Sequence, residues 1–333
     1  MIAEEVLVTG ASGFVGGHLA KRLVETGRNV RVLVRRSSDL SQLKGDRSIQ
    51  FFYGDLEDKE SLRDCMKGVT TVFHCAAKSS DWGKEIEFRN SNVIGLSHLV
   101  ELALENEQFR RFLHISSTDV YGYPVVPCGE QGALNDVGLP YNRSKIEGER
   151  RLLKSFRDFG FPVTILRPAT IYGPHSMSIV KEIFDHLKWR SMLLVDRGES
   201  RAGLVYVDNL VDAAIAASDS QDTIGKAYNI TDDEAVSWAV FVNRLADLMD
   251  RKRPFLNVSE CIGLKLGAFL EGVWGALNIS SRPPLTRHAV YLLARDQQFD
   301  NRQAKAEFGY RSKVSFEEGM KRTAEWLRAG QAL

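Results

Sequence analysis

The feature that most constrains this chain is a glycine-rich loop between its first apolar run and its first amphipathic segment. Glycines recur at every third position from Gly10 to Gly16 in the stretch Thr9–Gly16, which reads TGASGFVG. The first glycine allows a sharp turn, Gly13 leaves room for a ligand against the backbone, and Gly16 lets a helix lie close to a sheet. Because the amides and the dipole at a helix N-terminus attract anions, this loop predicts a site for the pyrophosphate of a dinucleotide. The residues predicted to contact it are Gly10, Ser12, Gly13, Phe14, Val15 and Gly16.

Short β-branched runs alternate with longer amphipathic segments over the first half of the chain. This alternation is typical of a parallel sheet wrapped by helices, and apolar runs such as Val30–Val34 indicate strands that are buried on both faces. The predicted strands are Glu5–Thr9, Val30–Arg35, Ile49–Tyr53, Thr71–Cys75, Arg111–Ser116 and Pro162–Arg167. The predicted helices are Gly13–Thr26, Glu60–Lys67, Phe88–Asn106 and Tyr141–Phe159.

The alternating pattern loosens after Pro168. A further strand is predicted at Leu204–Val207, and helices are predicted at Asn209–Ala217, Val236–Asp250 and Phe316–Arg328. The fold class is therefore α/β, with a doubly wound parallel sheet and a smaller, mostly helical C-terminal part. We predict a nucleotide-binding domain over residues 1–168, to which 204–231 return, and a substrate-binding part over 169–203 and 232–333.

Composition excludes several classes of partner. The chain has 333 residues, with 44 lysines and arginines against 43 acidic residues, so no overall charge points to nucleic acid. Its four cysteines lack the spacing of metal sites, which predicts free thiols in a reducing compartment and no bound metal. Because no secretory leader is recognisable, we expect a cytoplasmic protein.

One apolar segment, Ile262–Leu277, differs from the rest of the C-terminal part. It is shorter than the roughly 18–20 apolar residues that span a bilayer, and charged residues interrupt it. Its small residues occur four apart, at Gly263 and Gly267 and again at Ala268 and Gly272, which lets another backbone approach closely. The segment is predicted to form a wall of a substrate pocket or a dimer interface, with a peripheral membrane contact as one alternative and plain core as the other.

Two arginines, Arg35 and Arg36, lie at the end of the second predicted strand. An acidic residue at this place would bond the ribose hydroxyls of NAD and repel a 2′-phosphate. Guanidinium groups instead suit that phosphate, so NADP(H) is the preferred cofactor and NAD(H) the alternative. Further cofactor contacts are predicted after the third and fourth strands, at Asp55, Leu56, Ala76 and Ala77.

A tyrosine and a lysine, Tyr141 and Lys145, lie four residues apart and so on one face of a predicted helix. A free phenol titrates at about pH 10, and an ammonium group beside it favours the phenolate, which would make Tyr141 an acid or base. Ser117 follows the fifth strand, at the edge where open parallel sheets bind ligands. Together Ser117 and Tyr141 can hold a substrate oxygen while hydride moves to or from a nicotinamide, and Lys145 can bond the nicotinamide ribose.

Several short motifs are spread over nearly the whole chain: Thr9–Gly16, Ala76-Ala77, Asn92–Gly95, Ser116–Gly122, Tyr141–Lys145, Leu166–Pro174 and Val205–Asn209. In order and spacing they resemble those of the extended short-chain dehydrogenase/reductase family. The resemblance implies a Rossmann-type domain with a C-terminal substrate domain, and a catalytic triad of Ser117, Tyr141 and Lys145. It also implies that Pro168 lies at the nicotinamide, and that a homodimer forms through the Tyr141 helix and the helix before it.

Two branches of that family compete. Lys78–Gly83, Pro283–Arg287 and Phe308–Tyr310 look like the 3β-hydroxysteroid dehydrogenase and sterol-4-carboxylate dehydrogenase branch, which includes β-keto acid reductases. This similarity implies an NAD(P)-dependent oxidoreductase that interconverts a secondary alcohol and a ketone on a small hydrophobic substrate. Residues Ser117–Pro124 instead look like nucleotide-sugar enzymes, so a 4-epimerase is the alternative, ahead of a dehydratase. A cofactor-binding regulator without chemistry is the third interpretation. Substrate contacts are predicted at Lys78, Trp82, Thr118, His175 and Arg201.

Overall fold

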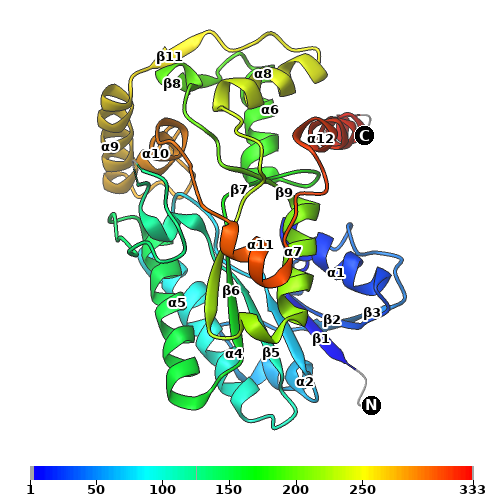
Figure 1. Ribbon diagram of the computed structural model, residues 1–333. Coiled ribbons are helices and arrows are strands. Elements are labelled where there is room, and N and C mark those ends of the chain that lie inside the picture. Colours follow the sequence, from blue (N-terminus) through cyan, green and yellow to red (C-terminus); the bar gives the residue numbers. More distant parts are fainter. Residues whose placement is uncertain (1–3, 125, 332–333) are drawn as a thin grey trace.

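The computed structural model describes residues 4–124 and 126–331, and a seven-stranded parallel sheet forms its centre (Figure 1). The strand order is β10-β6-β5-β4-β1-β2-β3, so the order reverses between β1 and β4 and opens a crevice at their carboxyl ends. This arrangement confirms the predicted doubly wound α/β fold. The strands are β1 (Glu5–Thr9), β2 (Asn29–Val34), β3 (Ile49–Tyr53), β4 (Thr71–His74), β5 (Arg111–Ile115), β6 (Val163–Pro168) and β10 (Lys226–Ile230).

Helices cover both faces of the sheet, because a strand points alternate side chains to opposite sides. Val6 and Val8 of β1 belong to the core beneath α1 and α7, whereas Leu7 belongs to the core beneath α2, α4 and α5. The first half of the sequence therefore supplies strands that are apolar on both faces, as predicted. These helices are α1 (Phe14–Glu25), α2 (Arg63–Met66), α4 (Gly95–Leu104), α5 (Pro140–Phe159) and α7 (Val207–Asp219).

A π-helical turn at Asn90–Ile94 divides the helix predicted at Phe88–Asn106 into α3 (Glu85–Arg89) and α4. Asn92 of this turn is buried, and its amide group donates to the Lys78 carbonyl over 3.1 Å and to Ser144 Oγ over 2.9 Å. These bonds fix the wide turn against the loop after β4 and against α5. Apolar periodicity alone does not reveal such a turn.

Strand β10 completes the sheet beside β6, although the sequence pattern predicts no strand there. Its apolar run is interrupted by Asn229, which is buried because its side chain accepts a hydrogen bond of 2.8 Å from the Tyr121 hydroxyl. The strand expected at Leu204–Val207 forms as β9 (Leu204–Tyr206), but it pairs with β7 (Thr170–Tyr172) outside the main sheet. The helix expected at Glu60–Lys67 is a 3₁₀ turn followed by the short α2.

Most of the C-terminal elements lie over the carboxyl ends of the sheet strands, in the upper half of Figure 1. A small ladder of β8 and β11 lies at the far end, and α11 (Arg302–Phe308) lies beside β10. The elements above the sheet are α6 (Glu182–Lys188), β8 (Leu193–Val195), α8 (Trp238–Leu248), β11 (Leu256–Val258), α9 (Glu260–Ala276), α10 (Arg287–Ala294) and α12 (Phe316–Gln331).

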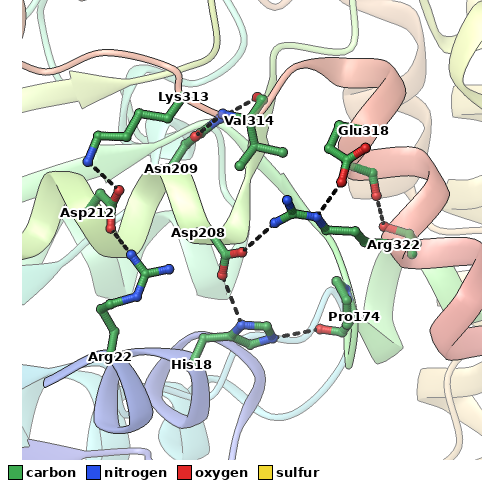
Figure 2. Close-up of polar contacts among 12 residues, drawn as sticks. His18, Arg22, Pro174, Asp208, Asn209, Asp212, Lys313, Val314, Glu318 and Arg322 are labelled. Carbon is green, nitrogen blue, oxygen red and sulfur yellow. Dashed lines mark hydrogen bonds and ion pairs between the residues drawn. The ribbon is translucent and has the colours of Figure 1, made fainter. Parts of the chain in front are cut away.

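A cluster of polar contacts joins α1 and α7 to α12 and to the segment before it (Figure 2). His18 of α1 lies 3.3 Å from Asp208 Oδ1 of α7 through Nδ1 and 3.1 Å from the Pro174 carbonyl through Nε2. Arg322 of α12 lies 3.5 Å from the other carboxylate oxygen of Asp208. Asp208 is therefore shared between the first helix and the last.

Helix α9 carries the apolar segment singled out in the sequence. Gly263 packs against Val290 of α10, and a Cβ on Gly267 would lie 3.0 Å from the Arg287 amide nitrogen, so these glycines let α9 and α10 touch. On its other side α9 exposes Phe269, whose surface is 65% accessible. No helix within the described ranges is long and apolar enough to cross a membrane.

Candidate active site

The glycine loop lies at the crevice between β1 and β4, where the strand order reverses. Gly10 has a φ of +72°, and a Cβ at this position would lie 2.6 Å from the Ala76 amide nitrogen. A Cβ on Gly16 would collide with the carbonyl oxygen of Gly10. Only glycine at these two positions lets the loop turn against β4 and lets α1 begin close beside it.

The N-terminus of α1 has the properties of an anion site. The capping residue, Gly13, has no side chain to accept a hydrogen bond from the first-turn amides, and the residues of this turn include no acidic side chain. A pyrophosphate fits here, because it would accept from these amides and meet the positive end of the helix dipole. The residues that would hold it are those predicted: Gly10, Ser12, Gly13, Phe14, Val15 and Gly16.

Arg35 and Arg36 follow β2 directly and are exposed. The Arg35 amide donates to Ser38 Oγ over 3.1 Å, which closes a turn, and the Arg36 guanidinium lies 5.6 Å from the centre of the Tyr53 ring. Within the described part of the chain neither arginine forms an ion pair. Both guanidinium groups are therefore available to a phosphate.

The other predicted cofactor residues follow further strands at the same edge of the sheet, because all the strands are parallel. Asp55 is exposed after β3, and Leu56 is buried against Gly95. Ala76 and Ala77 follow β4, and Pro168 ends β6.

Ser117, Tyr141 and Lys145 come together from the end of β5 and from α5. Ser117 caps a 3₁₀ turn (residues 118–121) after β5, with its Oγ accepting a hydrogen bond of 3.1 Å from the Asp119 amide. Lys145 Nζ lies 5.9 Å from the centre of the Tyr141 ring and donates to the Ile115 carbonyl over 2.8 Å. The ammonium group is thereby held between β5 and α5, one helical turn from the phenol.

Burial governs the protonation of both groups. It raises the pKa of Tyr141 well above its ordinary value; the charge of Asp119 adds to this increase, and a hydrogen bond with Ser117 opposes it. Burial also lowers the pKa of Lys145 to about 8, against the opposing charge of Glu149. The expected lowering of the Tyr141 pKa by Lys145 is therefore not found, because burial of the phenol favours its protonated form more strongly.

A cavity of about 510 Å³ opens beside Tyr141. Its apolar wall is formed by Trp82, Phe88 and Leu139, and Ala268 and Gly272 of α9 close one side. The small pair of residues noticed in the sequence thus gives α9 a flat face toward this cavity. Its charged lining residues are Asp81, Glu271, Arg287 and His288.

The predicted substrate residues lie in different surroundings in the structure, and they do not all line the cavity. Trp82 lines the cavity. Lys78 instead pairs with Glu87 of α3, with 2.9 Å between Nζ and Oε2. Thr118 is buried in the 3₁₀ turn after Ser117.

His175 and Arg201, also predicted as substrate contacts, are not among the residues that line the cavity. The His175 ring contacts the rings of His18 and Trp326, with centroids 6.0 Å and 5.4 Å away, so it packs between α1 and α12. Arg201 is exposed, and its backbone amide donates to Asp296 over 2.8 Å.

Two residues beside Tyr141 were not predicted to act in the site. His288 of α10 lies 6.2 Å from Tyr141 between ring centroids, and its Nε2 lies 3.3 Å from Asp119 Oδ2. The sequence gives no signal for His288, because it is far from Tyr141 along the chain and belongs to no periodic pattern. Asp119 could be noticed only as the carboxylate next to Thr118.

A buried ion pair anchors α5 beneath Lys145. Glu149 is fully buried and accepts from Arg167 Nη2 of β6 over 2.6 Å and from the Ser116 hydroxyl over 2.6 Å. Arg167 also donates to the Tyr121 hydroxyl over 2.7 Å. This network joins the helix of Tyr141 to β5 and β6, and so fixes the tyrosine relative to Ser117.

A parallel sheet with a glycine loop at its crevice, a serine after the end of β5, and a tyrosine and a lysine on α5 defines a nucleotide-dependent oxidoreductase. The chain belongs to the NAD dependent epimerase/dehydratase family, whose model matches residues 6–231. It is an NAD(P)-dependent enzyme of the extended short-chain dehydrogenase/reductase type.

Relatives of known sequence span nearly the whole chain. A 2-alkyl-3-oxoalkanoate reductase of Stenotrophomonas maltophilia is 30% identical, over 96% of this chain and 98% of its own. The decarboxylating sterol-4-alpha-carboxylate 3-dehydrogenase of Mus musculus is 28% identical, over 97% of this chain and 91% of its own. Among solved structures, a UDP-glucose 4-epimerase of Thermotoga maritima with UDP-glucose shares the fold, with a TM-score of 0.81, 24% identity, and coverage of 98% of this chain and 99% of that chain.

Proposed function

We propose that the protein interconverts a secondary alcohol and a ketone on a hydrophobic substrate of the 3-hydroxysteroid, sterol or 3-oxo acid type. The observation that carries this proposal is the cavity, in which Tyr141 shares a wall with Trp82, Phe88 and Leu139. Most of a hydrophobic ligand's surface can be buried by such a wall, while Tyr141 addresses one oxygen. The names of the oxoalkanoate and sterol relatives support the same substrate class.

The mechanism follows from the protonation of the site. A bound nicotinamide supplies or accepts the hydride. Tyr141, which keeps its proton in the buried site, donates it to the carbonyl oxygen during reduction, and Ser117 holds that oxygen by a hydrogen bond. Lys145 holds its positive charge beside the phenol, favours the phenolate that remains, and can bond the nicotinamide ribose.

The test is NADPH consumption by the purified protein with a panel of 3-ketosteroids and 3-oxo acids, repeated with Tyr141→Phe. We expect turnover by the wild-type protein and a loss of at least about a hundredfold in kcat in the variant, with NADPH affinity nearly unchanged. Full activity in Tyr141→Phe would refute the assignment of this residue.

If none of these ketones is reduced, the result would favour the alternative function, that of a nucleotide-sugar 4-epimerase. Such an enzyme returns the hydride to its substrate and consumes no cofactor. Arg201, which lies where nucleotide-sugar enzymes of the family often bind a phosphate of the substrate, is not among the residues that line the cavity, and this supports the ketone substrate. Conversion of UDP-glucose without NADPH consumption would favour the epimerase, and tight cofactor binding without any turnover would favour the regulator.

The preference for NADP(H) is a second part of the proposal, and it depends on Arg35 and Arg36. Arg35→Asp is expected to weaken NADPH binding at least tenfold more than NADH binding, because it removes a guanidinium and places a carboxylate beside the 2′-phosphate. Titration of both cofactors by fluorescence measures this ratio. Equal losses for the two cofactors would show that the arginine does not contact the phosphate.

We further propose a homodimer formed through α4 and α5, in a reducing cytoplasm. A groove of about 260 Å³ runs between these helices, and Phe159 at its end is 69% exposed. Light scattering of the purified protein tests the dimer, and a monomer at micromolar concentration would exclude it.

A peripheral membrane contact through the exposed side of α9 is tested by co-sedimentation with anionic vesicles, and protein left in the supernatant would exclude it.

A further inference from the structure

Helix α10 places a histidine beside Tyr141, although the helix is far from Tyr141 along the chain. His288, its second residue, lines the cavity and lies against the Tyr141 ring with a centroid distance of 6.2 Å and an interplanar angle of 26°. Its Nε2 lies 3.3 Å from Asp119 Oδ2, and the two side chains are only 13% and 10% exposed. The phenol, the imidazole and the carboxylate therefore form one buried group.

Asp119 opposes the chemistry of Tyr141 when it stands alone. A carboxylate close to a phenol disfavours the phenolate, and Asp119 raises the pKa of Tyr141 in this way. His288 supplies the opposite charge. Burial disfavours the imidazolium, but the hydrogen bond and the charge of Asp119 outweigh burial and raise the pKa of His288 above its ordinary value. Its Nδ1 is buried and finds no hydrogen-bond partner among the residues that the structure describes.

The other charged groups around His288 are compensated from elsewhere. Asp81, in the loop after β4, accepts from Arg282 Nε over 2.6 Å and from the Thr286 hydroxyl over 2.6 Å. Tyr123 lies 5.9 Å from His288 between ring centroids, and burial raises the pKa of its phenol, so it stays neutral. Lys145 of α5 also feels the charge of Asp119. His288 is the positive group that the C-terminal part adds, with its Nε2 3.3 Å from Asp119 Oδ2.

We propose that His288 is a positioning residue for Tyr141, which holds a positive charge against Asp119 and so links the docking of α10 to the charge around the reacting hydroxyl. This inference rests on the proposed function of Tyr141. It gives the C-terminal part a role in the reaction beyond binding substrate, because α10 must lie in place for Asp119 to be neutralised. Arg287, the residue before His288, instead pairs with Glu271 of α9 over 2.7 Å.

The first test is the pH dependence of alcohol oxidation, with NADP⁺ and the alcohol that corresponds to a ketone turned over by the wild-type protein. Oxidation needs the phenolate, so the rate rises as Tyr141 loses its proton. His288→Gln removes the positive charge that α10 places against Asp119, and we expect this rise to move to higher pH by about half to one unit. In Asp119→Asn we expect it to move to lower pH.

A double-mutant cycle separates this role from a merely structural one. If His288 acts through Asp119, adding His288→Gln to the Asp119→Asn variant leaves the pH profile where Asp119→Asn alone puts it. An equal shift in both backgrounds would overturn the proposal, as would the absence of a shift in the single variant. Arg295→Gln is the matched control, because it breaks an ion pair of 2.7 Å with Glu260 of α9 at the other end of α10, where neither residue lines the cavity. It is expected to leave the profile unmoved, and an equal shift there would also overturn the proposal.

A second measurement needs no substrate, so its result is independent of the proposed reaction. NMR titration of the histidine rings, with His288 assigned by its loss in His288→Gln, should show a ring that stays charged above pH 6.5. In Asp119→Asn that ring should become neutral at lower pH. An unchanged titration would show that the two residues are not coupled, even if the enzyme turns over ketones as proposed.

Discussion

At the scale of single residues, the chemistry depends on how burial treats opposite charges. Lys145 and Tyr141 lie in the same desolvated site, where the ammonium loses its proton more easily and the phenol less easily than in water. Each group is therefore displaced toward its neutral form until a ligand changes the local charge. A positively charged nicotinamide bound beside Tyr141 would favour the phenolate over the neutral phenol.

The lowered pKa of Lys145 leads to a testable pH dependence. Because the group is charged below a pKa of about 8 and neutral above it, kcat/KM for NADPH should fall above pH 8. The profile of kcat/KM against pH measures this limb, since it reports the free enzyme. Lys145→Met should have low activity without that limb, whereas Lys154→Met, on the exposed side of the same helix, should keep it. A wild-type profile flat to about pH 10, where an unperturbed lysine titrates, would contradict the assignment.

The residues of the site could be predicted to different extents. The glycines and the Tyr141–Lys145 pair could be predicted because local spacing fixes their geometry, in a loop and on one helix. His288 could not, because its place beside Tyr141 depends on how α10 packs against the rest of the chain. His175 follows a glycine and a proline, yet its ring packs against Trp326 and does not line the cavity.

At the scale of elements, α5 depends on a buried charge pair as well as on its apolar face. Glu149 is the sole carboxylate that the described residues place against Arg167, and both side chains are at most 5% exposed. The desolvated guanidinium loses its compensation when that carboxylate is removed. The pair therefore fixes where α5 lies against β6, and with it the position of Tyr141.

Glu149→Gln should lower the free energy of unfolding by about 3–5 kcal/mol, because it leaves Arg167 buried without a counter-charge. Urea unfolding measures this change. Glu147→Gln is the control on the same helix, where the partner Arg151 is 41% exposed, and it should cost less than about 1 kcal/mol. Comparable losses in the two variants would show that burial of the pair is unimportant.

The elements themselves were predicted where one pattern governs a whole segment. Strands β1 to β6 follow from apolar runs that are buried on both faces, and the predicted boundaries differ by a residue or two. The π turn and β10 could not be predicted from apolar runs, because buried polar residues determine where these two elements form. Asn92 and Asn229 are buried through hydrogen bonds to distant segments, and the sequence gives no sign of those partners.

At the scale of the whole molecule, the cluster of Figure 2 couples the cofactor loop to the end of the chain. The Asp208 carboxylate contacts two side chains: His18 of α1, the helix that follows the glycine loop, and Arg322 of α12. The same helix α1 is tied to Asp212 of α7 by Arg22, and Lys313 reaches that carboxylate over 2.8 Å. A displacement of α12 would therefore change the contacts that hold α1 and its N-terminus in place.

Asp208→Asn tests this coupling through the pH dependence of stability. The hydrogen bond with His18 and nearby positive charges hold the pKa of Asp208 below its ordinary value, against the effect of burial. An acid with a lowered folded pKa stabilises the fold above its unfolded pKa of about 3.9, and this contribution is lost as pH falls below it. The variant should therefore be less stable than the wild-type protein by about 1–2 kcal/mol at pH 7, and the difference should shrink below about pH 4.

Urea unfolding of both proteins between about pH 7 and about pH 3.5 measures that difference across the titration of the carboxylate. Asp219→Asn provides the comparison, because Asp219 pairs with Arg28 while 54% exposed and should contribute little at any pH. If Asp208→Asn costs the same at both ends of the pH range, the effect comes from packing, since a lost charge interaction must fade when the wild-type carboxylate is itself protonated. A cost that fades with acid would show that one shared carboxylate holds α1, α7 and α12 together.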